Sequence, residues 1–582
     1  MGKKRQIIFL LLLAVTLTVR LCVAHYLATD EPNDGTVYAQ LARNVLEHRG
    51  YSLAPEPPYD PTLIRLPGYP LFIAAVYAVC GHGNNAAVRV AQAFIDTASC
   101  ALVALLAFLW QPVAVRKWRA AACALALACA CPFVVIYAAT ILTETLTTFL
   151  ALALACAATL ALKSRRVRVR LSWWALAGLC AGAATLVRPD SGLFAAGVGL
   201  TLVVVQLCGA RGGGEQKSDA GGLAGGFARR FAGVLILGAL FASVCALVLV
   251  PWTLRNKRVF HLFQPLAPVY ANMPDEFVTR GYFRWVRTWI DDERYIEPVL
   301  WTIDDKPITV EQMPDKAFDS PDERARVAAL LDRYNHPPPE ASDDSDDEAG
   351  DESGVETTDS GKDQSDDDKA KTGEGDKDES KSDQGKSDEP SNAAPDSGEE
   401  QASADQSSAA DQTSVEMTPE IDAGFAQLAD ERVRRVPLRY YAWLPLKRAA
   451  ALWFDTHSQY YPFSGELFPL DDLDYDERQQ YWLPLFAALT WGYTILGAAG
   501  CWTLWHERRT GAWAWLLLAL LLTVPRLAFM SSLENPEPRY VVELFVFLAA
   551  LGGIALSGFR ANAPVRTSSP GARRVASAAD GA

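Results

Sequence analysis

The chain contains about ten stretches of mostly apolar residues, each close to the roughly 17 to 25 residues that a helix needs to cross a bilayer. Backbone amides find no water inside a bilayer, so a stretch of this kind crosses it as an α-helix. We therefore expect an all-α polytopic membrane protein with about ten transmembrane helices. The expected spans are residues 7–28, 86–110, 119–139, 142–162, 172–188, 190–208, 230–251, 482–504, 512–530 and 540–558.

The short loops between these spans have an asymmetric charge. Lys and Arg concentrate in residues 116–119, 163–170, 211–230 and 506–509 and in the C-terminal tail. Because basic loops stay on the cytoplasmic side, ten spans predict that both termini are cytoplasmic. We expect a multi-pass protein of the cytoplasmic (inner) membrane. The basic residues 3–5 also fit a signal peptide, but the lack of a clean cleavage site favours a retained anchor.

One further apolar stretch, residues 66–81, decides the topology. It is short and contains Pro67, Gly68 and Pro70, and a transmembrane assignment would invert every later loop. We therefore expect a helix that lies at the outer interface, anchored by its aromatic residues Tyr69, Phe72 and Tyr77. Residues 35–48 carry apolar side chains at helical spacing and predict a second interfacial helix, with Asp34 at its N-cap.

An acidic segment interrupts the largest region between spans. No Phe, Tyr, Trp or Leu occurs between Tyr334 and Phe425, where Asp, Glu, Ser and Lys are frequent. Such a segment cannot bury enough apolar surface to offset chain entropy, so we expect it to be disordered. It fits a tolerated insertion in a surface loop, or an acidic tail for a cation or a basic partner. The net charge of −14 comes mostly from this segment, and we expect no nucleic-acid partner.

These patterns divide the chain into eight parts. Aromatic residues on both sides of the acidic segment predict a small ordered cap on the outer membrane surface. The expected parts are 1–28 (first span), 29–85 (first outer loop), 86–251 (transmembrane bundle), 252–336 (first part of the cap), 337–424 (disordered acidic insertion), 425–481 (second part of the cap), 482–558 (last spans) and 559–582 (cytoplasmic tail).

Polar residues near membrane depth are costly, and their default interpretation is functional. Most of them fall at the outer ends of the expected spans or in the outer loops. The candidates are Asp34, Arg65, Tyr69, Glu144, Arg188, Arg255, His457, Arg539 and Tyr540. Several also have a structural interpretation, such as a pairing of Arg539 with Glu543 one helical turn away. Asp96, deeper in the second span, is expected to form a buried structural hydrogen bond.

Metal and nucleotide chemistry are not indicated. His457 has no second His or Cys at ligand spacing, so we expect no metal site. No phosphate-binding Walker loop precedes a helix, which disfavours an ATP-driven pump. We expect no cofactor, while a divalent metal is left open.

Taken in chain order, several of these motifs resemble a known group of enzymes. The motifs are Asp34 with Tyr38, R-L-P-G-Y-P at 65–70, T-E-T at 143–145, R-P at 188–189, P-W-T-L-R-N-K-R-V-F at 251–260 and P-R-Y at 538–540. They resemble type C membrane glycosyltransferases of the protein O-mannosyltransferase and lipid A aminoarabinose transferase group (glycosyltransferase family 39-like). The resemblance covers residues 1–260 and, less fully, 482–558.

The resemblance implies a polyprenyl-phosphate-linked sugar donor and a lipid, glycan or protein acceptor on the outer side. Asp34 would be the general base and Glu144 a second catalytic acid. Arg65, Arg188, Arg255 or Arg539 would neutralise the leaving lipid phosphate, because guanidinium groups match phosphate oxygens. Tyr69, His457 and Tyr540 complete the expected substrate contacts. Leu66 stands where relatives often carry a basic residue, and Asp30 and Glu31 remain alternatives to Asp34 as the base.

Two other functions fit parts of the sequence. A flippase or transporter of a polyprenyl-linked sugar or another anionic lipid would place charged or helix-breaking residues near mid-membrane in both halves. Here the charges gather at one rim, which favours the enzyme. A scaffold that recruits partners through the acidic segment is the third interpretation.

Overall fold

The computed structural model describes residues 3–27, 33–208, 223–337, 415–456, 460–461, 463, 465, 467, 470 and 477–558. Helices dominate this part of the chain, and its only strand-like pairings are two isolated bridges, Ser52 with Pro61 and Leu467 with Leu470. The expected all-α fold is therefore confirmed.

Nine helical segments in the described part are long and apolar enough to cross a membrane. They correspond to nine of the ten expected spans. They are α1 (Lys3–Tyr26), α4 (Asn85–Trp110), α7 (Glu144–Lys163), α8 (Val167–Val187), η3 with α9 (Pro189–Ser191 and Gly192–Cys208), α10 (Leu223–Val259), α15 (Glu477–His506), α16 (Trp513–Met530) and, after η11 (Pro538–Tyr540) and η12 (Val542–Leu544), α17 (Phe545–Leu556).

The remaining expected span, 119–139, is not one straight helix. It is built from α5 (Lys117–Ala130) and, after Cys131, α6 (Pro132–Val135) with η2 (Ile136–Ala138), bent by 57°. Pro132 explains the break, because proline lacks an N–H and its ring clashes with the preceding turn. The expected count of about ten holds if this bent pair forms one span.

Small residues let the spanning helices pack closely. A Cβ atom on Gly178 of α8 would lie 2.6 Å from the carbonyl oxygen of Phe241 in α10, and one on Gly182 would lie 2.7 Å from that of Cys245. Glycine at these positions therefore allows the two backbones to approach, as at other helix contacts in membranes.

A buried ion pair ties α1 to the bundle. Arg20 Nε donates to Asp96 Oδ2 of α4 at 2.8 Å, and its Nη groups donate to the carbonyls of Cys129 and Ala128 in α5. Both charged side chains are almost completely buried. The expected buried hydrogen bond of Asp96 is thus confirmed, with Arg20 as the partner that the sequence did not reveal.

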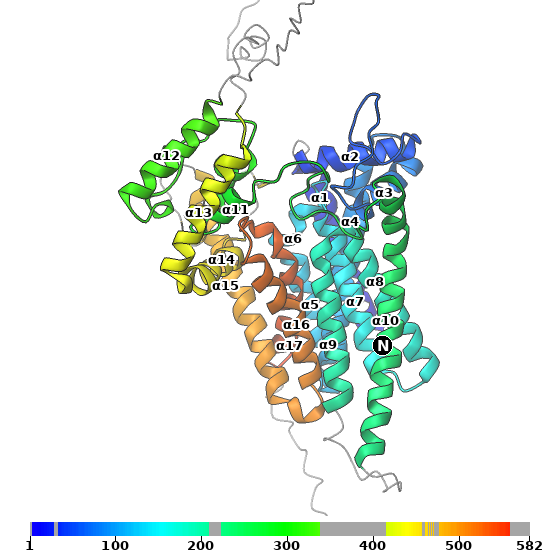
Figure 1. Cartoon of the computed structure of the whole chain (residues 1–582). Helices are drawn as coiled ribbons and strands as arrows, with labels where there is room; N and C mark the ends of the chain where they lie inside the picture. Colours follow the sequence, from blue (N-terminus) through cyan, green and yellow to red (C-terminus); the bar gives the residue numbers. More distant parts are fainter. Residues whose placement is uncertain are drawn as a thin grey trace, which may run out of the picture.

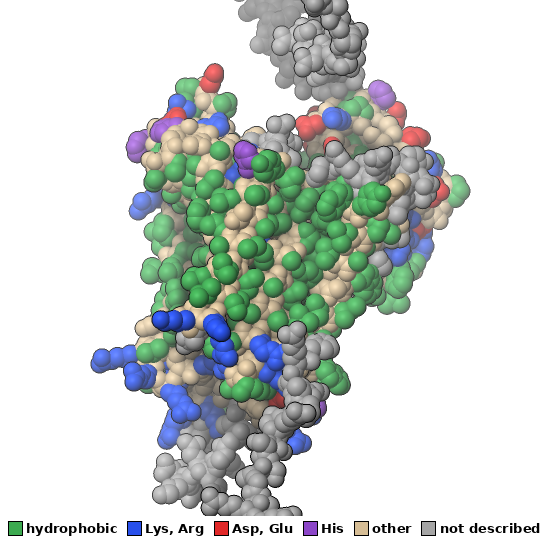
Figure 2. Space-filling model, turned by 180° about the vertical axis from the view of Figure 1, so that it is seen from behind, with side chains coloured by type: hydrophobic (Ala, Val, Ile, Leu, Met, Phe, Trp, Pro, Cys, Tyr) green, Lys and Arg blue, Asp and Glu red, His purple; other side chains and the backbone are tan. Residues whose placement is uncertain are grey.

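The two ends of the bundle differ in charge. An apolar belt covers the middle of the molecule, and Lys and Arg side chains gather at its lower end (Figure 2). The opposite end carries α2 and α3 on one side and the helices of the cap on the other (Figure 1). We call these the basic end and the cap end.

Helices α2 (Asn33–Leu46) and α3 (Gly68–Cys80) pack on each other and on the bundle. The ring of Tyr69 is fully buried against Tyr38 of α2, with centroids 5.1 Å apart, and Tyr77 is also fully buried. The expectation that both tyrosines anchor α3 in lipid is therefore wrong, because protein surrounds them. Asp34 lies inside the first turn of α2 rather than at its N-cap, since the helix begins at Asn33.

The cap has its own core. It contains α11 (Arg280–Val286), α12 (Pro321–Asn335), α13 (Pro419–Arg435) and the short helices η5 (Glu293–Tyr295), η6 (Glu297–Trp301), η7 (Val310–Gln312) and η8 (Asp315–Ala317). Buried Tyr282, Trp285 and Trp289 from one side of the acidic segment pack with Phe425 and Leu428 from the other. The two sides of the acidic segment therefore share one hydrophobic core.

The expected acidic insertion, 337–424, is too long at its C-terminal end. Val415, Met417 and Ile421 are buried in the cap core, and α13 starts at Pro419. Thr418 explains this start, since its side chain accepts from the backbone N–H of Ile421 as an N-cap. Residues 338–414 and the tail from 559 lie outside the described residues.

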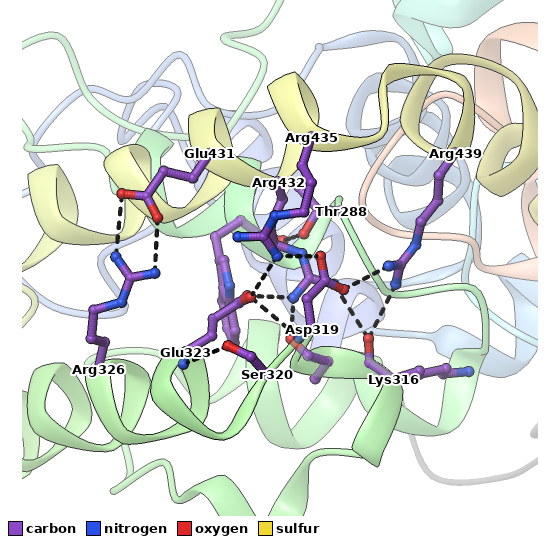
Figure 3. A network of polar contacts seen from close by, with 12 residues as sticks. Thr288, Lys316, Asp319, Ser320, Glu323, Arg326, Glu431, Arg432, Arg435 and Arg439 are labelled. Atoms are coloured by element: carbon purple, nitrogen blue, oxygen red, sulfur yellow. Dashed lines mark hydrogen bonds and ion pairs between the residues drawn. The ribbon is translucent and has the colours of Figure 1, made fainter.

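Charged side chains reinforce the contact between α12 and α13 (Figure 3). Arg432 of α13 is almost fully buried and pairs with Glu323 of α12 and with Asp319. Arg439 adds a second contact to Asp319 at 2.7 Å. Two further elements, η9 (Arg439–Trp443) and α14 (Leu444–Phe454), lead from the cap back to the bundle.

Candidate functional site

Asp34 is held by two guanidinium groups at the cap end. Arg65 Nη2 donates to its Oδ1 at 3.0 Å, and Arg539 Nη2 donates to its Oδ2 at 3.2 Å. The three residues come from the first turn of α2, the segment before α3 and the turn before α17. The sequence therefore brings residues from both ends of the chain to one carboxylate.

The surroundings of Asp34 keep it ionised. Burial alone would raise its pKa, but the Arg539 and Arg65 guanidinium groups outweigh burial and hold the pKa of Asp34 below its ordinary value. The carboxylate is still about 29% exposed, so a ligand can reach it.

A second charged group lies deeper in the bundle. Arg188, at the C-terminal end of α8, pairs with Glu144 Oε1 at 3.0 Å and with Asp190 Oδ1 at 3.3 Å. Arg526 of α16 pairs with Asp190 Oδ2 at 2.6 Å and with Glu543 Oε2 at 2.9 Å. All five side chains are buried or nearly so, and three carboxylates face two guanidinium groups.

Tyr540 joins the two groups. Its ring lies under the Arg188 guanidinium, with 5.1 Å from Cζ to the ring centroid, and under the Arg539 guanidinium at 5.4 Å. Glu537 contacts Nε of Arg539 from the same turn. The groups therefore form one continuous polar site at the cap end.

Four of these residues were missed by the sequence interpretation as site residues. Asp190 follows the recognised Arg-Pro pair directly, and Glu537 lies in the same short turn as Arg539. Glu543 was considered only as a partner of Arg539, but it pairs with Arg526 and Arg188 instead. Arg526 stands inside an apolar span, and an ionisable residue there is a functional signal that would have identified it.

Arg255 lies apart from the Asp34 carboxylate. Its Nη1 donates to the carbonyl of Thr62 at 2.6 Å and its Nη2 to that of Tyr51 at 3.3 Å. Its guanidinium also lies over the rings of Tyr51, Trp252 and Phe260. Arg255 therefore braces the loop that carries Arg65, and its expected contact with the lipid phosphate stays a prediction.

Four other residues were candidates from the sequence, and the structure describes one of them, Tyr69. Tyr69 is fully buried, its hydroxyl donates to Gln92 Oε1 at 2.6 Å, and its ring packs against Tyr38 of α2. His457 lies outside the described residues, as do Asp30 and Glu31, the alternatives to Asp34 as the base. Within the described ranges, no three His, Cys, Asp or Glu side chains are arranged to hold a metal ion.

A cavity of about 500 Å³ lies next to the segment that carries Arg65. Leu63, two positions before Arg65, forms one wall, and residues of the segment 262–280 form the rest. Burial and, after it, the negative charge of Glu534 raise the pKa of Tyr270 in that segment. The cavity is therefore bordered, through Leu63, by the segment that delivers Arg65 to Asp34.

The lining of the cavity is mixed. Leu262, Pro268 and Val269 supply apolar surface, and Gln264 and Asn272 supply amides. Arg280 is the one charged side chain among the described lining residues, and it is exposed. The volume lies in the roughly 300–1,000 Å³ range of small-molecule sites.

The fold and the site define a class of protein, namely a polytopic membrane protein with a buried cluster of charges at one end of its bundle. Residues 7–264 match the family model described as dolichyl-phosphate-mannose-protein mannosyltransferase. This match confirms the resemblance drawn from the motifs, over a region that holds Asp34, Arg65, Glu144, Arg188 and Arg255.

One solved structure is also similar to the chain. It is ArnT from Cupriavidus metallidurans bound to undecaprenyl phosphate, with 13% identity and a TM-score of 0.34. The alignment covers 94% of this chain and 78% of that chain. No curated protein sequence matches the chain.

Proposed function

We propose that this protein is a membrane glycosyltransferase that moves a sugar from a polyprenyl-phosphate-linked donor to an acceptor at the cap end. The observation that carries the proposal is the Asp34 carboxylate held between Arg65 and Arg539. A partly exposed base beside two guanidinium groups provides both proton acceptance and phosphate binding. The family match over residues 7–264 supports the same class of reaction.

In the proposed reaction, Asp34 takes the proton of the acceptor hydroxyl or amine as that atom attacks the anomeric carbon. The new glycosidic bond forms on one face of the sugar while the bond from the anomeric carbon to the phosphate oxygen breaks on the other. The lipid phosphate leaves with the electron pair, and the configuration at the anomeric carbon inverts. Proton transfer of this kind contributes roughly 10²–10⁴-fold to the rate.

Arg65 and Arg539 have two successive roles in this scheme. Before the donor binds, they pair with Asp34 and weaken it as a base, since a carboxylate with a low pKa holds a proton poorly. A donor phosphate competes for the same guanidinium groups, because charge-assisted bonds to phosphate are strong. Donor binding therefore frees Asp34 and raises its pKa, so that the base is active only when the donor is present.

Glu144 is proposed to orient the sugar. One of its oxygens pairs with Arg188, and its Oε2 is buried without a hydrogen-bond partner among the described residues. A buried carboxylate oxygen without a partner is costly, and a sugar hydroxyl would satisfy it. Asp190, Arg526 and Glu543 hold Arg188 and Glu144 in place through the buried ion pairs described above.

The acceptor is proposed to enter through the cavity lined by Leu63 and residues 262–280. Its amides and Arg280 suit a polar acceptor, and it lies beside the segment that carries Arg65. The cap end is proposed to face away from the cytoplasm, because the Lys and Arg side chains gather at the other end. The protein would then be a multi-pass protein of the cytoplasmic membrane with both termini inside.

The test is to incubate the purified protein in lipid vesicles with a panel of polyprenyl-phosphate hexoses and pentoses and to measure the release of free polyprenyl phosphate. Release of polyprenyl phosphate from at least one donor is the expected result. Movement of a labelled donor between leaflets without its consumption would favour the flippase or transporter. The panel also identifies the sugar.

A further inference from the structure

An apolar surface lies exposed where the chain returns from the cap to the bundle. It is formed by Leu438, Tyr441, Trp443 and Leu446, of which Leu438 is 74% and Trp443 55% exposed. We call this surface the 438–446 face. Single exposed apolar residues are common, but four on one short segment mark a contact surface.

The 438–446 face continues the lipid-facing surface of a membrane span. Phe454, at the end of α14, stacks on Trp491 of α15, with centroids 4.4 Å apart and planes 27° apart. Trp491 is half exposed and lies on α15 with exposed Leu485 and Ile495. Figure 1 shows α14 beside the upper end of α15, while α12 rises above it. The segment therefore adjoins the apolar belt.

The composition of the face suits the boundary between lipid headgroups and acyl chains. Trp and Tyr prefer this depth because their rings are apolar with one polar atom. Arg435 and Lys447, each about half exposed, flank the face and pair with Asp319 and Asp291 of the cap. In water, a face of this kind would leave large apolar side chains exposed, which is unfavourable, whereas insertion into lipid removes them from water.

We infer that the 438–446 face is inserted into the lipid leaflet at the cap end and that this insertion positions Arg539. The link to Arg539 is direct, since α14 packs against η11, the turn that carries it. A second link runs through Tyr440, whose hydroxyl accepts from Arg287 Nε at 2.8 Å. Arg287 in turn pairs with Glu534 at 3.8 Å, five residues before Arg539.

Lipid insertion can be tested without any assay of activity. The full chain is reconstituted into vesicles that contain a phosphatidylcholine with a photoreactive group near its glycerol, and adducts are mapped on tryptic peptides. Peptide 440–447 should be labelled at a level approaching that of peptide 510–526, which includes most of α16. Peptide 327–333, from α12, is the negative control. Labelling of peptide 440–447 no higher than that of peptide 327–333 would overturn the inference and favour a protein partner on this face.

The link to Arg539 rests on the proposed function and needs a second arm. The combined variant Tyr441→Ser, Trp443→Ser and Leu446→Ser should lower kcat for donor consumption in vesicles by roughly 10- to 100-fold, because misplacement of a catalytic group by about 1 Å has effects of this size. Trp502→Ser, on the lipid-facing side of α15 away from the turn, should leave kcat unchanged. Equal kcat in both variants would overturn the link to Arg539.

The labelling experiment and the kcat comparison give independent results. If the wild-type protein consumes no donor, the proposed function is wrong, while the labelling of peptide 440–447 still decides whether the face enters lipid. The substituted side chains are exposed, so the variants should fold, and equal melting temperatures would confirm this.

Discussion

Asp34 and Arg539 are 505 positions apart in the sequence, yet Nη2 of Arg539 donates to Oδ2 of Asp34 at 3.2 Å. The contact joins the first turn of α2 to the turn before α17. It lowers the pKa of the carboxylate that we propose as the base. The same contact therefore restrains the base in the free protein and gives a donor phosphate a cation to displace.

The first prediction concerns pH. In the free protein Asp34 has a lowered pKa, so its ionised form and its ion pairs persist until the pH falls below the ordinary carboxyl value of about 4. The pH at which kcat/KM falls reports the free enzyme, and the pH at which kcat falls reports the donor complex. Because the donor is proposed to raise the pKa of Asp34, kcat/KM should fall at a lower pH than kcat. Rates of polyprenyl-phosphate release measured between about pH 3 and 8 provide the test.

Arg539→Gln and Arg539→Lys are the matched pair for this test. Loss of one cation should raise the pKa of Asp34, so Arg539→Gln should move the acid limb of kcat/KM to higher pH. Arg539→Lys keeps the charge and should move it less. An acid limb that stays in place in Arg539→Gln would show that Asp34 is not the titrating base.

The second prediction concerns the deeper charges. Arg526→Gln leaves Glu144, Asp190 and Glu543 with Arg188 alone among their described partners. Breaking a buried pair costs about 3–5 kcal/mol, because a charge remains buried without compensation. The melting temperature of the solubilised variant should fall accordingly. Arg229→Gln, at the exposed start of α10, is the control, and equal melting of the two variants would contradict the prediction.

The third prediction separates structure from catalysis with two aspartates. Asp96→Asn should lower the melting temperature, because Arg20 keeps its buried charge and loses its carboxylate partner. The surviving folded protein should keep its kcat, since the pair lies within the bundle and touches no residue of the Asp34 site. A selective loss of kcat with normal melting would instead assign a catalytic or transport role to this pair.

The fourth prediction concerns the acidic segment. The backbone N–H of Glu416 donates to the carbonyl of Tyr334 at 3.4 Å, so the chain leaves and rejoins the cap at nearly the same place. Replacing residues 338–414 by a short Gly-Ser linker should therefore preserve melting and donor consumption. Phe425→Ala, a truncation in the shared core, should instead destabilise the cap by about 3–5 kcal/mol. Loss of activity on deletion would support the scaffold interpretation.

The sequence predicted the spans well because length and apolarity alone determine them. It failed at Pro132, where a local break bends the expected span, and at Tyr69 and Tyr77, whose burial depends on packing of α2 and the bundle over α3. The one-sided gathering of charges predicted a site at the cap end, and Asp34, Arg65 and Arg539 do meet there.

The ion-pair partners of the charged site residues could not be predicted from the sequence. Arg539 was expected to pair with Glu543, because the two lie four residues apart and would share a helical face. The helix does not begin until Phe545, and the 3-10 turns η11 and η12 direct Glu543 toward Arg526 instead. Sequence spacing alone could not predict that Glu543 pairs with Arg526, because this pairing depends on where α16 places the Arg526 guanidinium group.

The most direct test of the account compares Asp34→Asn with Asp60→Asn, two changes in the same loop, on the donor that the wild-type protein consumes. Asp60 is exposed, and no contact is described for it. We expect Asp34→Asn to lower the rate of polyprenyl-phosphate release by roughly 10²–10⁴-fold and Asp60→Asn to leave it unchanged. Release at the wild-type rate by correctly folded Asp34→Asn would contradict this expectation.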